Sequence, residues 1–417
     1  MNLNQKTVMF MAGLLAAALL SACTAQRTQA DRPVTIEFWH NYDAGAGQIA
    51  VLDSLIAQFQ NENPGIRVNH LFLEWSALRD NVVMGAATRM LPDVLRGDIA
   101  FVPQFQSLGI LVEMSALPDY ALTANKLLSG PNSTARMGDK FYGIAANTNT
   151  KILFYNRQIL ENARIEVPRT FDELWDAATR LSGNNRFGFV EAWTGVWNVG
   201  QFIWSNGGDV LAPDYSTARG YINGPIAVQT IQKLADLYQA RVLSGPSLDP
   251  GAMGDTDGLA AGIYAMVIDG PWRASLARDA GIDMGAAPLP RGNTGSVGVL
   301  GGENFMMFQT SDNAHQLAAW EFIKFLTGKD AQAAMAKAGQ MPVNIEAISD
   351  PAVLDAMPLL PVFAQSLQTA RTRPVTPRWG EMENIIATKV AEAMLGQKPV
   401  LQALNEAAEE IDRLIAR

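Results

Sequence analysis

The feature that most constrains the fold is a repeated switch between two hydrophobic periods. Residues 34–39, VTIEFW, alternate in the period of two that is typical of a strand. Residues 49–59 then place apolar side chains three and four positions apart, which predicts a helix, and NENPG ends it. IRVNHLFL, residues 66–73, has the composition of a second strand. This order predicts a βαβ unit.

The same alternation continues along the chain and predicts an α/β protein. PDVLRG predicts a third strand, and KILFYN, FGFV and AMVIDGPW predict strands of a second α/β unit that begins near residue 148. Thr170 and Glu173 form the sequence signature of a capping box at the start of a helix. Ligands of such proteins bind outside the carboxyl ends of the strands. The polar and aromatic residues at these ends are Trp39, His40, Asn41, Glu74, Asp98, Glu191, Trp193, Asp269 and Trp272.

The N-terminal segment is predicted to be a signal peptide and not part of the fold. Its apolar run from Val8 to Leu20 is shorter than the roughly 20 residues that a membrane-spanning helix needs. Leu20-Ser21-Ala22-Cys23 resembles the lipobox of bacterial lipoproteins, in which the cysteine carries the lipid. The chain has one cysteine, so an internal disulfide is impossible. We therefore expect residues 1–22 to be removed, Cys23 to be lipidated and residues 23–32 to form a tether, which places the protein in the periplasm or at the cell surface.

Composition excludes several functional classes. A net charge of −9 provides no basic surface for nucleic acid. The chain has three histidines, His40, His70 and His315, and none has the spacing of a zinc site. It has no P-loop and no G-x-S-x-G motif. We therefore expect no metal, no cofactor and no enzymatic activity.

Several landmarks, in order along the mature chain, resemble those of the extracellular solute-binding proteins of ABC sugar importers, the family of maltose- and trehalose-type binding proteins. These landmarks are EFWHNYD, NPGIRV, PDV, YGIAANTNTKILFYN, TFDELW, AMVIDGPW, VGVLGGENF and TPRW. The resemblance implies a type II periplasmic-binding-protein fold, in which two α/β lobes hold a sugar between them. It implies lobe crossings near residues 146–149, 285–290 and 341–343. The N-terminal lobe would comprise residues 33–146 and 290–341, and the C-terminal lobe residues 147–289 and 342–417.

The resemblance also implies a site and partners. Trp272, Trp193 and Trp379 would stack on sugar rings, because a pyranose has apolar faces that match aromatic surfaces. Glu74, Asp98 and Glu191 would bind hydroxyls, and the Gly301–Asn304 stretch would let the backbone approach the ligand. The full set adds Trp39, His40, Asn41, Asn147, Asp269, Gly302, Glu303 and Arg378. The expected partners are a di- or oligosaccharide and the permease subunits of an ABC importer. The chain would act as a monomer that closes on its ligand.

Alternatives remain open from the sequence. Trp175 and Trp320 lie in helical patterns that favour core packing, and Asp98 could simply cap the next helix. Arg378 could bind an anionic group, so a phosphorylated or acidic sugar such as glycerol 3-phosphate is a second candidate ligand. A sensing lipoprotein would share the same cleft. A glycosidase would use similar carboxylates and aromatics.

Overall fold

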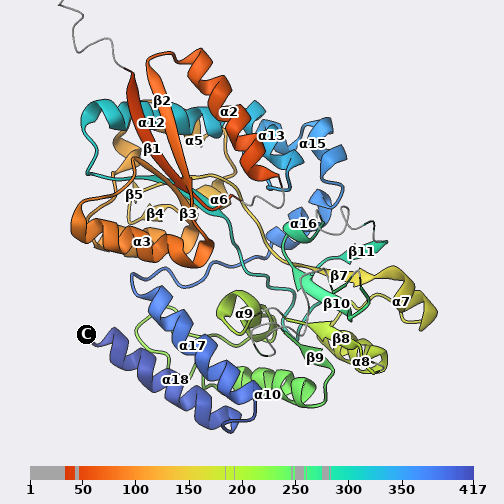
Figure 1. Ribbon diagram of the computed structural model, residues 1–417. Helices are drawn as coiled ribbons and strands as arrows, with labels where there is room; N and C mark the ends of the chain where they lie inside the picture. Colours follow the sequence, from red (N-terminus) through yellow and green to blue (C-terminus); the bar gives the residue numbers. More distant parts are fainter. Residues whose placement is uncertain are drawn as a thin grey trace, which may run out of the picture.

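The chain forms two lobes, one above the other in Figure 1. The computed structural model describes residues 33–42, 47–183, 185–191, 193–245, 248, 258–259, 261–274, 281 and 283–417, and of residues 75–76 the backbone alone. The predicted signal peptide, tether and lipidated Cys23 lie outside the described residues. None of the described helices is long and apolar enough to cross a membrane.

The first lobe is built on a sheet with the strand order β2-β1-β3-β12-β6. β1 pairs in parallel with β2 and β3, whereas β12 runs antiparallel to β3 and β6. The strands are β1 (Val34–His40), β2 (Ile66–Phe72), β3 (Val94–Asp98), β6 (Ile144–Ala145) and β12 (Glu303–Met307), beside the hairpin of β4 (Arg136–Met137) and β5 (Lys140–Phe141). The helices are α2 (Gln48–Glu62), α3 (Trp75–Thr88), α4 (Val102–Ser107), α5 (Tyr120–Ala124), α6 (Ser129–Ser133) and α12 (Asn313–Leu326), with 3-10 turns η2 (Ile99–Phe101) and η3 (Met114–Ala116).

The second lobe is built on a sheet with the order β11-β7-β10-β8-β9. Its strands are β7 (Ile152–Asn156), β8 (Phe187–Val190), β9 (Leu243–Ser244), β10 (Tyr264–Asp269) and β11 (Met284–Ala287). Its helices are α7 (Arg157–Asn162), α8 (Phe171–Leu181), α9 (Val196–Ser205), α10 (Pro225–Gln239), α16 (Leu360–Leu367), α17 (Trp379–Met394) and α18 (Val400–Ile415). Three further helices, α13 (Lys329–Lys337), α14 (Ile345–Ile348) and α15 (Pro351–Ala356), follow α12.

Apolar side chains cover both faces of each sheet, as expected for strands buried on two sides. In the first lobe, α2 and α12 pack on one face and α3 and α4 on the other. In the second lobe, α8, α9, α10, α17 and α18 share one core, and residues of α13, α15 and α16 form another. The predicted capping box is present, because Thr170 accepts from the Glu173 amide and Glu173 accepts from the Thr170 amide. Trp175 and Trp320 are buried, as predicted.

The chain crosses between the lobes where Asn149 and Gly301 pair as antiparallel neighbours. Two predicted lobe limits need correction. Residues 291–299 lie with the second lobe and not the first, since Arg291 bonds to the backbone of Arg169 and Val299 belongs to the second-lobe core. Val343 lies with the first lobe, because its carbonyl accepts from the Leu128 amide.

Candidate functional site

A cavity of about 310 Å³ lies between the lobes at the ends of their strands. Residues of both lobes form its walls, which is the position expected for a ligand site in an α/β protein. The lining residues are Asp98, Asn149, Trp193, Trp197, Asn198, Trp272, Gly301, Gly302, Glu303 and Arg373.

Three indole rings of the second lobe face this cavity. Trp193 follows β8, Trp197 lies in the first turn of α9, and Trp272 follows the turn after β10. All three are partly exposed, and the rings of Trp197 and Trp272 have centroids 6.4 Å apart at 34°. Partly exposed indoles at the wall of a cavity offer flat apolar surfaces with an N–H at the edge. They suit a ligand that has both apolar faces and polar groups.

The first lobe contributes two carboxylates to the opposite wall. Asp98 is the last residue of β3 and Glu303 is the first residue of β12, and the two are directly paired in the antiparallel register. Asp98 also caps η2 by accepting from the amide of Ala100 at 2.7 Å. The capping role that the sequence left open therefore coexists with a place in the cavity wall.

Glu303 is held by a buried arginine, Arg96, whose side chain is 1% exposed. The Arg96 guanidinium lies 4.1 Å from the centroid of the Tyr42 ring and donates to several oxygens. These acceptors are Asn41 Oδ1 at 2.5 Å, Asn147 Oδ1 at 3.0 Å, Glu303 Oε2 at 3.0 Å and Gln340 Oε1 at 2.9 Å. The network fixes the Glu303 carboxylate at the cavity wall.

Asp98 is held by a different arginine, Arg373, which belongs to the segment before α17. Arg373 Nη2 donates to Asp98 Oδ1 at 2.5 Å, and Arg373 Nη1 lies 3.8 Å from Glu383 Oε2. The guanidinium carbon is 5.6 Å from the centroid of the Trp197 ring. Arg373 thus joins a second-lobe segment to a first-lobe carboxylate.

A buried ion pair lies beside Trp197, because Lys151 Nζ is 5.4 Å from the centroid of that ring. Lys151 Nζ lies 3.2 Å from Glu191 Oε1, and both side chains are at most 3% exposed. Asn198 and Gln201 also donate to Glu191. Burial raises the pKa of Glu191 to about 7, although Lys151 opposes the shift. Glu191 therefore orients Asn198, which lines the cavity.

Glycine is required where the two lobes approach the indoles. A Cβ on Gly301 would lie 2.2 Å from Asn149 Oδ1 and 2.6 Å from the Trp197 ring. Gly302 has a φ of +132°, and a Cβ there would lie 2.5 Å from the Asn147 carbonyl oxygen. Both glycines allow the crossing strands to pass close to the cavity.

The structure brings five of the predicted residues to the cavity wall: Asp98, Trp193, Trp272, Gly302 and Glu303. Three others support that wall. Asn41 and Asn147 bond to Arg96, and Glu191 bonds to Asn198. Whether any of them contacts a ligand stays a prediction.

Other predicted residues are engaged elsewhere. His40 is fully buried, and its Nε2 bonds to His70 Nδ1 at 2.9 Å. Trp39 packs on the first-lobe core beneath α3, and Glu74 is exposed at the start of that helix. None of the three lines the cavity: Trp39 and His40 turn to opposite faces of the sheet and pack there, and Glu74 lies at the start of α3.

The second lobe likewise places three predicted residues away from this cavity. Asp269 accepts from Arg273 Nη2 at 2.6 Å. Arg378 is bonded to Glu381 and to the carbonyl of Leu414, so it does not face the ligand cavity. Trp379 is 1% exposed and packs in the second-lobe core, although it also lines a neighbouring cavity.

Sequence reasoning missed Trp197, Arg373, Asn149 and Asn198. Trp197 and Asn198 follow Trp193 closely, at the amino end of the helix after β8, and this position was a usable signal. Arg373 is one of three arginines in RTRPVTPRW, and nothing local distinguishes it. Its importance depends on contacts with residues far away in the sequence.

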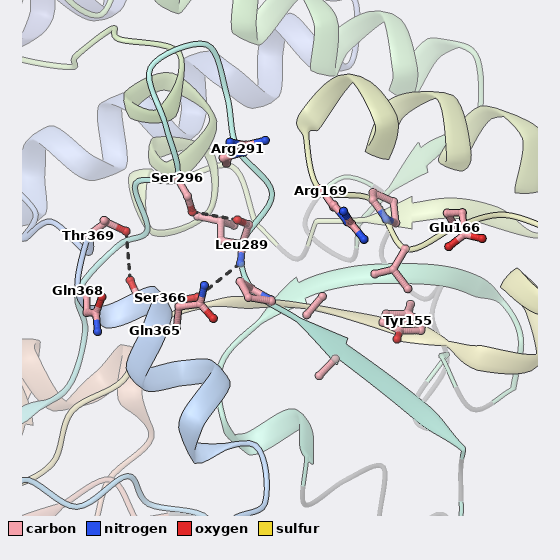
Figure 2. A pocket seen from close by; sticks show the side chains of 15 residues that line it. Tyr155, Glu166, Arg169, Leu289, Arg291, Ser296, Gln365, Ser366, Gln368 and Thr369 are labelled. Carbon is pink, nitrogen blue, oxygen red and sulfur yellow. Dashed lines mark hydrogen bonds between the residues drawn. The ribbon is translucent and has the colours of Figure 1, made fainter.

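A larger cavity of about 690 Å³ lies on the second lobe outside the cleft (Figure 2). Its lining includes Leu289, which follows β11, together with Arg169 and Arg291. The hydroxyl of Ser296 donates to the Leu289 carbonyl at 2.9 Å, and the Leu289 amide donates to Ser366 Oγ at 3.4 Å. These polar groups are already bonded to the protein, so size alone does not make this cavity the better candidate site.

Two α/β lobes with a ligand-sized cavity at their strand ends define a two-lobed binding protein. The family model for bacterial extracellular solute-binding proteins matches residues 45–333, and the chain belongs to this family. The family resemblance and the two-lobe fold expected from the sequence are therefore confirmed.

Individual relatives align with nearly the whole length of this chain. A protein of Brucella abortus (strain 2308), named as a binding protein, is 26% identical over 422 residues, which cover 97% of this chain and 98% of that protein. The galactooligosaccharide-binding protein of Bacillus subtilis (strain 168) is 22% identical, with 98% and 97% covered. The structure of maltose-bound T. maritima MalE3 superposes with a TM-score of 0.78 at 25% identity, and covers 91% of this chain and 100% of that chain.

Proposed function

We propose that this solute-binding protein takes up a neutral di- or oligosaccharide in the cleft and delivers it to the permease subunits of an ABC importer. The observation that carries the proposal is the convergence of Trp193, Trp197 and Trp272 opposite Asp98 and Glu303 in one cavity. Indoles match the apolar faces of sugar rings, and carboxylates accept hydrogen bonds from hydroxyls. Relatives named for galactooligosaccharide binding and for bound maltose support the same ligand class.

The charges around the cavity favour a neutral ligand over a phosphorylated or acidic sugar. Within the described residues, each cation near the cavity whose side chain is at most 13% exposed has an acid partner. The pairs are Arg373 with Asp98, Arg96 with Glu303, Lys151 with Glu191 and Arg273 with Asp269. An anionic group would have to displace one of these carboxylates and leave it buried without its partner, which is costly.

A second cavity favours a ligand of more than one ring. This cavity of about 400 Å³ shares Trp193 and Arg373 with the first and continues between α3 and α17. Its polar lining includes Asp80, Gln104 and Asn384. A chain of sugar rings that passes Trp193 would use both cavities, whereas a single ring would fill only one.

The same contacts argue against hydrolysis of the ligand. A glycosidase needs one carboxyl group that carries a proton. Asp98 and Glu303, the two acids of the cavity wall, each lie within 3.0 Å of a guanidinium nitrogen. Each carboxylate is thus already engaged by an arginine as a hydrogen-bond acceptor, so neither is free to donate to a glycosidic oxygen. We therefore propose that the site binds its ligand and does not cleave it.

Binding in this cleft would be coupled to closure of a monomeric protein. A ligand held by the second-lobe indoles completes its polar contacts only when the first-lobe carboxylates meet it. Closed lobes are then favoured by the additional contacts. The permeases would recognise the closed arrangement.

Titration calorimetry tests this function directly. The panel contains mono-, di- and trisaccharides and glycerol 3-phosphate. We expect saturable binding of a neutral di- or trisaccharide and weaker binding of its monosaccharide unit. Binding of glycerol 3-phosphate alone would replace the proposal by the phosphorylated-ligand alternative, and release of a smaller sugar during the titration would show catalysis.

The anchor at Cys23 is tested by fractionation. We propose that lipid on Cys23 holds the protein at a membrane outside the cytoplasm, because two or three acyl chains bind firmly where one is marginal. The full-length protein should then sediment with membranes, and Cys23→Ser should appear in the soluble fraction. Processed wild-type protein that is entirely soluble would contradict the anchor.

A further inference from the structure

Arg373 is the buried cation that joins the two lobes. Its side chain is 4% exposed, and it leaves the second lobe to reach Asp98 at the end of β3, with 2.5 Å between Nη2 and Oδ1. A second acid, Glu383 of α17, lies 3.8 Å away on its own lobe. One arginine therefore has an acid partner in each lobe, a close one across the cleft and a more distant one beside it.

Arg373 also forms part of the cavity wall. Its guanidinium lies over the ring of Trp197, and it lines both cavities of the cleft. The amide of Trp197 donates to Glu383 Oε1 at 3.3 Å. The indole and the two acids are thus in direct contact with the same guanidinium, so that movement of Arg373 alters the surface that a ligand meets.

We propose that Arg373 is a positioning residue that couples lobe closure to the ligand site: it bonds to Asp98 in the closed arrangement and transfers to Glu383 when the lobes separate. Asp98 moves away with the first lobe on opening, whereas Glu383 stays beside Arg373. A buried guanidinium without an acid partner is strongly disfavoured, so a second acid lowers the cost of opening. In the structure, where Arg373 bonds to Asp98, burial raises the pKa of Glu383, which agrees with an acid whose partner is mostly engaged elsewhere.

The chain contains a matched control two residues away. Arg371 Nη2 lies 2.6 Å from Asp209 Oδ2, and its guanidinium carbon is 5.0 Å from the centroid of the Trp204 ring. Arg371 thus contacts an aspartate and a tryptophan as Arg373 does, but it is 42% exposed and both of its partners belong to the second lobe.

The test measures the separation of the lobes in the full chain without ligand. Spin labels replace Leu122 on α5 and Leu401 on α18, which are 65% and 53% exposed. A Cys23→Ser background leaves no other cysteine. Arg373→Met and the milder, nearly isosteric Asp98→Asn should both shift the distance distribution to longer values. Arg371→Met should leave it unchanged, and Glu383→Gln should shift it to shorter values.

Affinity provides the second readout, and here the inference rests on the proposed saccharide function. For the best sugar of the calorimetric panel, Arg373→Met should weaken binding by at least about 10-fold through faster dissociation. Glu383→Gln should tighten it by about 3-fold, because the closed population increases. Opposite signs for Arg373→Met and Glu383→Gln, two side chains that face each other, would not arise from general loss of packing.

The outcomes separate the two proposals. Unchanged distances in both Arg373→Met and Asp98→Asn, or an equal change in Arg371→Met, would overturn the coupling role. Longer distances in Glu383→Gln would overturn the transfer to Glu383. If the distances respond as expected and no saccharide binds, the coupling role stands and the saccharide function fails. If Arg373→Met does not fold, Asp98→Asn and Glu383→Gln decide the result.

Discussion

Asp98 and Glu303 stand directly opposite each other on adjacent antiparallel strands, and each is bonded to a different buried arginine. Like charges at such a position are destabilising on their own. Arg96, from within the first lobe, compensates Glu303, and Arg373, from the second lobe, compensates Asp98. Asp98 therefore has its arginine partner only while the lobes are together, which links the charge of the cavity wall to the closure that we propose.

Trp272 is expected to act in binding and not in folding. Trp272→Ala should weaken binding of the best sugar by about 2 to 4 kcal/mol, the range of a residue that anchors an interface. Since the indole is partly exposed at the cavity, the melting temperature of the unliganded protein should hardly change. Calorimetry and thermal unfolding measure the two effects.

Trp320→Ala is the control for this substitution. Trp320 is 1% exposed in the first-lobe core, so its loss should cost about 3 to 5 kcal/mol of folding stability. A Trp272 variant that behaved in this way, with affinity intact, would assign Trp272 to the core.

Glu191 should make folding stability fall as the pH rises. Its pKa is about 7 in the folded protein and is raised mainly by burial, from an ordinary value of 4.5. The folded state therefore holds the proton more tightly, and the free energy of unfolding decreases between about pH 4.5 and 7 and then levels off. Glu191→Gln mimics the protonated form. Between about pH 4.5 and 7, wild type should therefore lose stability relative to this variant, which does not titrate at position 191. Chemical denaturation of both proteins at several pH values measures this change.

His40 should have the opposite effect on stability. Burial, together with the charges of His70 and Arg96, lowers its pKa from 6.5 to about 3. Its neutral form stabilises the folded state above pH 6.5, and this contribution is lost as the pH falls toward 3. His40→Gln cannot be protonated, so the stability advantage of wild type over the variant should diminish below pH 6.5. An advantage that stayed constant down to pH 4 would show that His40 is not held neutral.

Local patterns in the sequence were sufficient to predict most of the fold. The period of two in β1 and the capping box of α8 depend on neighbours in the chain, and both are present. The turn after β10 places Trp272 at the cavity as expected. Signals of this kind are local, because they depend only on residues that are close together in the sequence.

Other parts of the site depend on distant contacts that no local pattern reveals. Arg373 acquires its role from Asp98, 275 positions away in the sequence. Trp379 was expected to stack on a sugar, although its spacing to Met382, Ile386 and Val390 is that of a buried helix face, which the structure confirms. The helical period predicts the burial of Trp379, and its contact with a sugar stays a prediction because it lines the second cavity. Nothing in RTRPVTPRW distinguishes Arg373 from its neighbours.

Gly301 is expected to be intolerant of any side chain. A Cβ at this position would meet Asn149 Oδ1 at 2.2 Å and the Trp197 ring at 2.6 Å, so both of these side chains would have to shift. Gly301→Ala should therefore displace the indole and weaken sugar binding by more than about 10-fold, with about 1 to 3 kcal/mol lost from folding stability. Gly65→Ala is the matched control, since nothing lies within 4 Å of a Cβ there. Calorimetry and denaturant unfolding of both variants measure these effects, and wild-type affinity in Gly301→Ala would show that the ligand does not depend on the position of Trp197.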